Sequence, residues 1–184
     1  MNRDEAVALV QQHVKNANLV KHCLAAEAVM AALAERLGEN KEKWSLAGLL
    51  HDLDVEVTKA DPKVHGLESV KMLGSVGIDP EVVDAIKMHN EEAAGAKRSA
   101  KFHHALAAAE TITGLIVAST LVLPDKKLAS VKPESVVRRM KEKAFARSVN
   151  RDTIRECEKI GIPLDEFARI AVTAMQGISG QIGL

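Results

Sequence analysis

The sequence predicts an all-α protein, a helical bundle followed by a C-terminal helical extension. Apolar residues recur with the three- and four-residue spacing of amphipathic helices, and no segment shows the convincing alternation that is typical of a strand. Glycine, proline and polar cap residues separate the helical segments by short connections, as expected for a bundle. The chain has 184 residues, so we expect residues 1–184 to form a single domain with a full-sized core.

The first three helices are predicted from apolar stripes and their stop signals. Two acidic residues in a first turn indicate a helix over 3–16, and a stripe that ends at Gly38 indicates another over 18–37. The third helix lies within 44–54. Its apolar face consists of four leucines at i, i+3, i+4 and i+7, namely Leu46, Leu49, Leu50 and Leu53.

The next segments follow the same logic. We expect a loop over 55–64 and a helix over 65–76. A further helix starts at Asp79 and Pro80, because a cap residue followed by proline is a common helix start. A polar loop over 90–101 leads to the longest helix, 102–122. Three further helices are predicted over 133–145, 151–160 and 164–177, and the tail is expected to be irregular.

Composition excludes several classes of function. The 25 basic and 25 acidic residues balance, so no overall field attracts nucleic acid or a membrane. The chain has no Tyr, one Trp and three Phe, too few aromatic faces for a base-stacking surface. The N-terminus lacks the apolar core of a signal peptide, and no apolar run approaches membrane-spanning length. Two cysteines form no disulfide framework, so we expect a reduced, cytoplasmic setting.

Six ionisable residues share an unusual position, because each lies on or beside the apolar face of its helix. They are His22, His51, Asp52, His65, His89 and Glu110. Buried ionisable groups need partners, and a shared metal ion would supply one to all of them. Imidazole and carboxylate ligands suit manganese, iron, zinc or cobalt. Local hydrogen bonds at a helix end are the alternative explanation for the His51–Asp52 pair taken alone.

The order of these residues resembles the HD superfamily of metal-dependent phosphohydrolases. The resemblance covers roughly residues 19 to 117, and the motif HGLES at 65–69 is similar to the second-metal histidine motif of the two-metal branch. The whole chain, including TGLIVAS at 113–119 and DKKLASV at 125–131, resembles a prokaryotic subgroup of predicted HD hydrolases. The implied fold is an HD-domain helical bundle with its core over about 18–122 and a helical extension over 123–184.

The resemblance also implies a role for each residue. His22, His51, Asp52 and Glu110 would bind a first ion, and Asp52 would bridge to a second ion held by His65 and His89. One or two divalent ions would activate a water that attacks phosphorus in a small phosphorylated metabolite or nucleotide, as in a phosphomonoesterase or phosphodiesterase. Non-catalytic metal or nucleotide binding in a regulatory protein, and di-iron oxygenase chemistry, are the alternatives.

Two departures from the family pattern concern the ligands and the catalytic groups. The last ligand is usually Asp, whereas this chain has Glu110, whose side chain is one methylene longer. No lysine follows the His-Asp pair, so a lysine role has no counterpart here. Asp54 or Glu56 is instead a candidate general acid or base beside Asp52, with a solvated helix end as the alternative.

The extension begins with a basic segment that offers a possible phosphate-binding clamp. Residues 125–151 contain nine basic and three acidic residues. Lys127, Arg139 and Arg147 are the candidates for binding a substrate phosphate, and a solvated helix face is the ordinary alternative. His103 and His104 are adjacent on a helix and cannot easily face one ion, so we expect surface histidines there.

Overall fold

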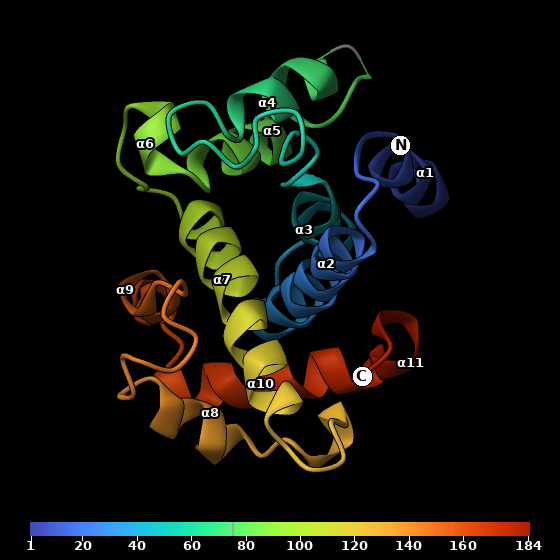
Figure 1. Ribbon diagram of the computed structural model, residues 1–184. Coiled ribbons are helices and arrows are strands. Elements are labelled where there is room, and N and C mark those ends of the chain that lie inside the picture. The colour runs from blue at the N-terminus through green and yellow to red at the C-terminus, as the bar shows by residue number, and fades with distance from the viewer. Residues whose placement is uncertain (75) are drawn as a thin grey trace.

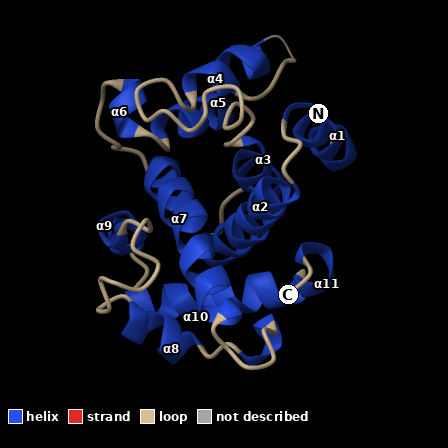
Figure 2. Cartoon of the chain, in the orientation of Figure 1, coloured by secondary structure: helices blue, strands red, loops and turns tan. Residues whose placement is uncertain are grey.

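The computed structural model describes residues 1–74 and 76–184, which contain helices and no strand (Figure 2). The prediction of an all-α fold is therefore confirmed. In chain order the helices are α1 (Arg3–His13), α2 (Ala17–Leu37), α3 (Lys41–Leu50), α4 (Leu67–Gly74), α5 (Pro80–Met88), α6 (Glu91–Ala94), α7 (Lys101–Leu121), the 3-10 helix η1 (Leu128–Ser130), α8 (Pro133–Arg139), α9 (Arg151–Ile154), the 3-10 helix η2 (Arg155–Ile160), α10 (Leu164–Gly177) and α11 (Ser179–Ile182).

Helices α2 and α7 form the centre of the bundle. Helix α7 runs from the end of the molecule that holds α4, α5 and α6 toward the end that holds α8, α10 and α11 (Figure 1). Helix α2 packs against α3, α7 and α10. One hydrophobic core therefore includes residues from both halves of the chain, such as Leu33, Leu106 and Phe167.

The close packing of α3 on α2 depends on Gly48. A Cβ atom at this position would lie 2.6 Å from the carbonyl oxygen of Ala26, inside the backbone of α2. Because glycine has no Cβ, α3 can rest directly on α2. This approach brings His51, the C-terminal cap of α3, next to His22 on α2.

Several predicted boundaries differ from the structure, and local backbone geometry explains most of them. Helix α1 ends at His13 because Val14 is extended, and α4 begins at Leu67 because Gly66 has a φ of +95°. Ser75, within the helix predicted over 65–76, lies outside the described residues. Helix α3 covers Lys41–Leu50 rather than 44–54, so Leu53 lies beyond its end, and the helix predicted over 151–160 is α9 followed by the 3-10 helix η2. The predicted loop over 90–101 contains the short helix α6, α8 ends at Arg139 rather than 145, and the tail contains α11.

The expectation that no segment approaches membrane-spanning length needs correction for α2 and α7. Each helix has 21 residues and an 18-residue window of mean hydropathy 1.3, so by length and composition each could cross a membrane. Such helices also occur in the cores of helical bundles, and 44% of the window in α2 and 67% of that in α7 is buried inside the structure. Both helices carry residues of the site described next.

Candidate metal centre

Four imidazoles converge on the carboxylate of Asp52. The Nε2 atoms of His65, His51 and His89 lie 3.1, 3.3 and 3.8 Å from Asp52 Oδ1. The Nε2 atom of His22 lies 3.7 Å from Oδ2 of the same carboxylate. Four separate segments of the chain therefore supply five of the six side chains that the sequence singled out for this site.

The opposite nitrogen of every ring is held by an oxygen atom. The Nδ1 contacts are His22 with Thr113 Oγ1 (2.9 Å), His51 with the Gly48 carbonyl (2.8 Å), His65 with Asp54 Oδ1 (2.8 Å), and His89 with the Ile86 carbonyl (2.5 Å). Carbonyl and carboxylate oxygens only accept hydrogen bonds, so Nδ1 carries the hydrogen in three of the rings. The Thr113 hydroxyl donates to the Glu110 carbonyl at 2.7 Å and therefore accepts from His22.

This arrangement leaves Nε2 as the atom that offers a lone pair in each neutral ring. The Nε2 atoms of His22 and His51 are 3.2 Å apart, and those of His65 and His89 are 3.1 Å apart. At the His22–His51 pair, two lone pairs face each other beside a carboxylate and need a positive centre between them. At the second pair, the charged His65 ring supplies that positive charge when no ion is bound. Imidazoles whose Nδ1–H is held by an oxygen are the usual ligands of protein-bound metals. The residues therefore fit a metal ion.

The ligand atoms form two groups that share Asp52. His22, His51 and Asp52 form one group, and Asp52, His65 and His89 form the other, with the atoms of each group within 4.8 Å of one another. Three nitrogen or oxygen ligands in a compact cluster leave room for further ligands on a divalent cation.

Electrostatics at the site follow from burial and mutual proximity. Burial lowers the pKa of His51 and of His89 to about 4, so both rings are neutral near pH 7. Burial also disfavours the charge on Asp52, but the neighbouring histidines outweigh it and hold its pKa well below the usual range. For His65, hydrogen bonds to Asp52 and Asp54 outweigh burial and raise the pKa to about 10.

Glu110 lies near the first group but outside it. Its Oε2 atom is 4.0 Å from His22 Nε2, and its other oxygen accepts a hydrogen bond from the Thr111 hydroxyl. Burial raises the pKa of the Glu110 carboxyl to about 8. The structure therefore places the Glu110 carboxyl group next to the group formed by His22, His51 and Asp52. It is not among the atoms that lie within 4.8 Å of one another.

Comparison with known families agrees with this geometry. The family model of the HD domain matches residues 19–120. The chain belongs to the HD-domain family. The resemblance to the HD superfamily is therefore confirmed, and this family consists generally of metal-dependent phosphohydrolases. No curated protein and no solved structure matches the chain.

Within this HD domain, the position of Asp54 fits neither a general acid or base nor a solvated helix end. Its side chain is fully buried, so it is not a solvated helix end. It accepts hydrogen bonds from His65 Nδ1 and from the backbone N–H groups of Gly66, Glu68 and Ser69. The carboxylate thus orients His65 and caps the start of α4, and it has no contact with the cavity that would suit a general acid or base.

The other candidate, Glu56, is also occupied away from the cluster. Its carboxylate accepts hydrogen bonds from the backbone N–H groups of Lys15 and Asn16, at 3.1 and 2.7 Å. It therefore anchors the connection between α1 and α2.

The backbone conformation and the close approach of His89 explain why the HGLES motif has a glycine at position 66. Gly66 has a φ of +95°, which side-chain-bearing residues rarely adopt, and a Cβ there would lie 3.0 Å from Cε1 of His89. Its N–H also donates to Asp54 at 2.7 Å. The motif therefore turns the chain, lets two histidines approach and ties His65 to its carboxylate.

A cavity of about 850 Å³ opens over the cluster. His22, Asp52, His65, His89 and Glu110 line its floor. Its walls come from the loop around α6 and, across it, from residues 148–150 and Thr153 of the extension. The volume is in the range of small-molecule sites, and the ligand groups are accessible from it.

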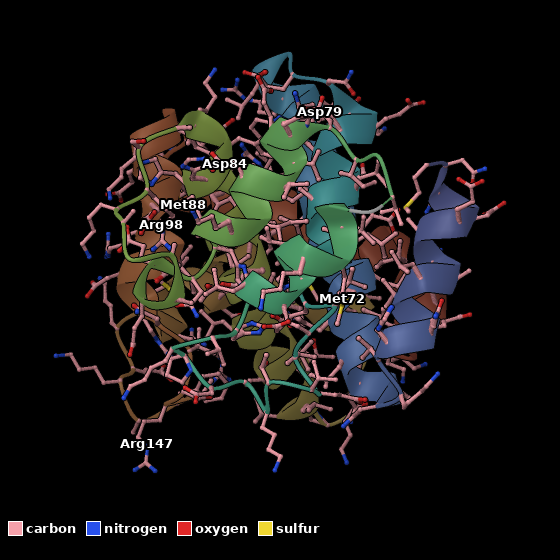
Figure 3. The ribbon with its side chains drawn as sticks, turned by 90° about the horizontal axis from the view of Figure 1, so that it is seen from above. Met72, Asp79, Asp84, Met88, Arg98 and Arg147 are labelled. Carbon is pink, nitrogen blue, oxygen red and sulfur yellow. The ribbon has the colours of Figure 1, made fainter. Side chains whose placement is uncertain are left out.

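The three proposed phosphate-binding cations do not line this cavity. Lys127 is exposed beyond the far end of α7, and Arg139 stacks on Phe145 with its Cζ 3.9 Å from the ring centroid. Arg147 is exposed and extends away from the body of the molecule (Figure 3). The extension does reach the cavity, but through Ser148, Val149 and Asn150 rather than through these cations, so the geometry gives the clamp no support.

The expectation of surface histidines at the start of α7 is wrong. His103 and His104 are both buried, with relative exposures of 7% and 8%. His103 Nε2 lies 2.7 Å from Asp84, and His104 Nδ1 lies 2.6 Å from Glu156. Adjacent rings on a helix point in different directions, as expected, but each meets its own carboxylate.

Sequence reasoning missed Arg98 and Glu156, which pair beside the site. Arg98 lies in the polar loop before α7 and also lines the cavity. Its guanidinium forms a bidentate pair with Glu156, at 2.8 and 2.7 Å. The two residues are 58 positions apart, so no helical periodicity connects them and no local signal could have found the pair.

Proposed function

We propose that this HD-domain protein is a cytoplasmic metal-dependent phosphohydrolase that acts on a small phosphorylated metabolite or nucleotide. The observation that carries the proposal is the pair of ligand groups that share Asp52 beneath an accessible cavity. In this proposal one ion lies among His22, His51 and Asp52, and a second among Asp52, His65 and His89. Manganese, iron, zinc and cobalt all suit imidazole and carboxylate donors.

Bound divalent ions would lower the pKa of a water molecule and offset the charge that develops on the phosphoryl oxygens. The protein's own contribution is to hold the ligands. The Nδ1 contacts fix the tautomer and the plane of each imidazole before any ion binds. The Asp52 carboxylate, charged throughout the neutral range, contacts both groups: Oδ1 lies near His51, His65 and His89, and Oδ2 lies near His22.

Glu110 has a place in this proposal as a further carboxylate ligand of the first ion. It lines the cavity and lies 4.0 Å from His22 Nε2. A small side-chain rotation would bring it to the first ion, and its extra methylene relative to Asp extends its reach. The substrate would enter over the walls formed by the α6 loop and the extension, and neither nucleic acid nor a membrane is part of the proposal.

The test combines elemental analysis with a panel of phosphomonoesters and phosphodiesters assayed in Mn²⁺. We expect stoichiometric transition metal and turnover of at least one ester, both lost in Asp52→Asn. Asp61→Asn is the matched control, because Asp61 is exposed in the following loop and should keep both properties. A protein that binds metal, hydrolyses no ester and consumes oxygen with iron would be an oxygenase, and nucleotide binding without turnover would indicate a regulator. Either result contradicts the proposal.

A further inference from the structure

The Arg98 side chain holds the C-terminal end of α5, where His89 lies. Its side chain is 8% exposed, and Nη1 donates to the carbonyls of Met88 and His89 at 3.2 and 3.0 Å. Figure 3 shows Arg98 beside Met88. Carbonyls at a helix C-terminus have no partner within the helix, and a cation is favourable there. The guanidinium therefore fixes the backbone of a candidate metal ligand.

The other edge of the guanidinium is held by the extension. Glu156 lies in η2, outside residues 19–120 of the HD-domain match, and its side chain is 11% exposed. It accepts hydrogen bonds from Arg98 Nε and Nη2 and a third from His104 Nδ1 at 2.6 Å. One buried carboxylate thus connects the extension, α7 and the end of α5.

The geometry shows how this network reaches the ligand cluster. The His89 ring is held on its Nδ1 side by the Ile86 carbonyl, and on its backbone by Arg98. Its Nε2 atom lies 3.1 Å from His65 Nε2 and 3.8 Å from Asp52 Oδ1, and these contacts complete the second ligand group. A shift in the last turn of α5 would move the ring, because side-chain tilt follows the backbone of its own turn.

We propose that Arg98 and Glu156 are a positioning pair through which the C-terminal extension sets the ligand geometry of His89. The inference rests on the proposed role of His89 as a metal ligand. The C-terminal extension then helps to position a metal ligand, because Glu156 holds the Arg98 guanidinium in the orientation that donates to the carbonyls of Met88 and His89. Loss of an outer partner of a metal ligand typically weakens metal binding about 10- to 100-fold, so an effect of that size is expected on the His65–His89 side.

The experiment uses variants that separate positioning from folding. Removing one member alone leaves a buried unpaired charge and can unfold the protein, whereas replacing both by apolar residues of similar size is often neutral. The double variant Arg98→Met with Glu156→Gln removes the hydrogen bonds to the two carbonyls and leaves no unpaired charge, and it keeps a side-chain oxygen at position 156 as the acceptor for His104 Nδ1. Arg98→Lys keeps the charge but loses the planar fork. Glu158→Gln is the matched control, because Glu158 lies in the same 3-10 helix and its side chain pairs with the exposed Arg155 at 3.2 Å.

Each full-length variant is titrated with Mn²⁺ after its thermal unfolding has been compared with wild type. We expect the double variant and Arg98→Lys to bind at the His22–His51 side with wild-type affinity and at the His65–His89 side at least about tenfold more weakly. Glu158→Gln should match wild type in both steps. Unchanged affinity in both steps for the folded double variant and for Arg98→Lys overturns the inference.

A second readout needs no metal. In NMR spectra of the metal-free protein, the Cε1–H resonance of His89 should shift or broaden in the double variant and in Arg98→Lys, while that of His51 stays in place. An unmoved His89 resonance contradicts positioning even if wild type binds no ion. Failure of wild type to bind Mn²⁺ would overturn the proposed function alone.

Discussion

The His65 imidazole is held between two aspartates, with Nδ1 2.8 Å from Asp54 Oδ1 and Nε2 3.1 Å from Asp52 Oδ1. Asp54 is completely buried, and three backbone N–H groups at the start of α4 also donate to it. One carboxylate thus couples the orientation of a candidate ligand to the start of a helix. A change at Asp54 should therefore affect stability and metal binding together.

Asp54→Asn should lower both the free energy of unfolding and the affinity for metal on the His65 side. Hydrogen bonds to a charged group contribute about 1.5–3 kcal/mol each, so we expect a loss of at least about 2 kcal/mol. Metal affinity should fall about tenfold or more, because His65 loses its charged partner. Urea unfolding and Mn²⁺ titration measure the two effects, with Asp61→Asn as the exposed control. Wild-type values in both assays would show that Asp54 does not position the ring.

The metal-free protein should show a stability maximum near pH 6–7. The pKa of His51 and of His89 is lowered to about 4 in the folded state, so between about pH 6.5 and 4 only the unfolded chain takes up their protons. Stability therefore falls as the pH falls through this window. For His65 the folded pKa is raised to about 10, so its contribution is complete below about pH 6.5 and is lost as the pH rises toward 10.

Thermal unfolding of the metal-free protein across pH 4–10 measures this profile. His65→Gln should remove the decline between about pH 8 and 10 and leave the acidic limb in place. The raised pKa of Glu110, about 8, should still cause a smaller decline as the pH rises toward 8. A stability curve that is flat between pH 6.5 and 10 in wild type would contradict the assignment of a charged His65.

Gly48→Ala should destabilise the protein in spite of the higher helix propensity of alanine. The added Cβ would meet the Ala26 carbonyl at 2.6 Å, and backbone atoms cannot move aside without separating α3 from α2. We expect a loss of about 1–3 kcal/mol, the usual range for overpacking, and weaker metal binding on the His22–His51 side. Gly177→Ala is the control, because nothing lies within 4 Å of a Cβ there. Equal stability of the two variants in urea unfolding would contradict the close-packing argument.

Glu110→Gln should weaken metal binding on the His22–His51 side, because an amide oxygen is a poorer ligand than a carboxylate. Glu110→Asp should retain more affinity than Glu110→Gln if the backbone of α7 can approach the ion. Elemental analysis after dialysis against a series of chelators ranks the three proteins by the amount of metal that each retains. The same metal content in wild type and Glu110→Gln would show that this carboxyl group is not a ligand.

The histidine cluster was predictable because its residues obey a simple rule. An ionisable residue on or beside the apolar face of a helix needs a buried partner, and this rule selected His22 and His89, among others, from separate helices. The family order then joined them to His51, Asp52 and His65, which the structure brings together. The helical bundle was likewise predictable, since periodicity and cap residues are local signals.

The residues that hold the candidate metal ligands in place could not be predicted from the sequence. The roles of Asp54 and Glu156 depend on which backbone or side chain lies opposite after folding, across separations of up to 58 residues. Charge counting placed a phosphate-binding role on Arg147, but composition does not determine side-chain direction, and the cavity wall is made by its neighbours Ser148 and Val149 instead.

The central claim is that two cation positions share Asp52, and site-resolved metal titration tests it most directly. Wild type should bind two Mn²⁺ ions in two steps, His22→Ala should lose one step and His89→Ala the other, while Asp52→Asn should lose both. Circular dichroism checks that every variant remains helical. A single binding step in wild type that is unchanged in His22→Ala and in His89→Ala would contradict the claim.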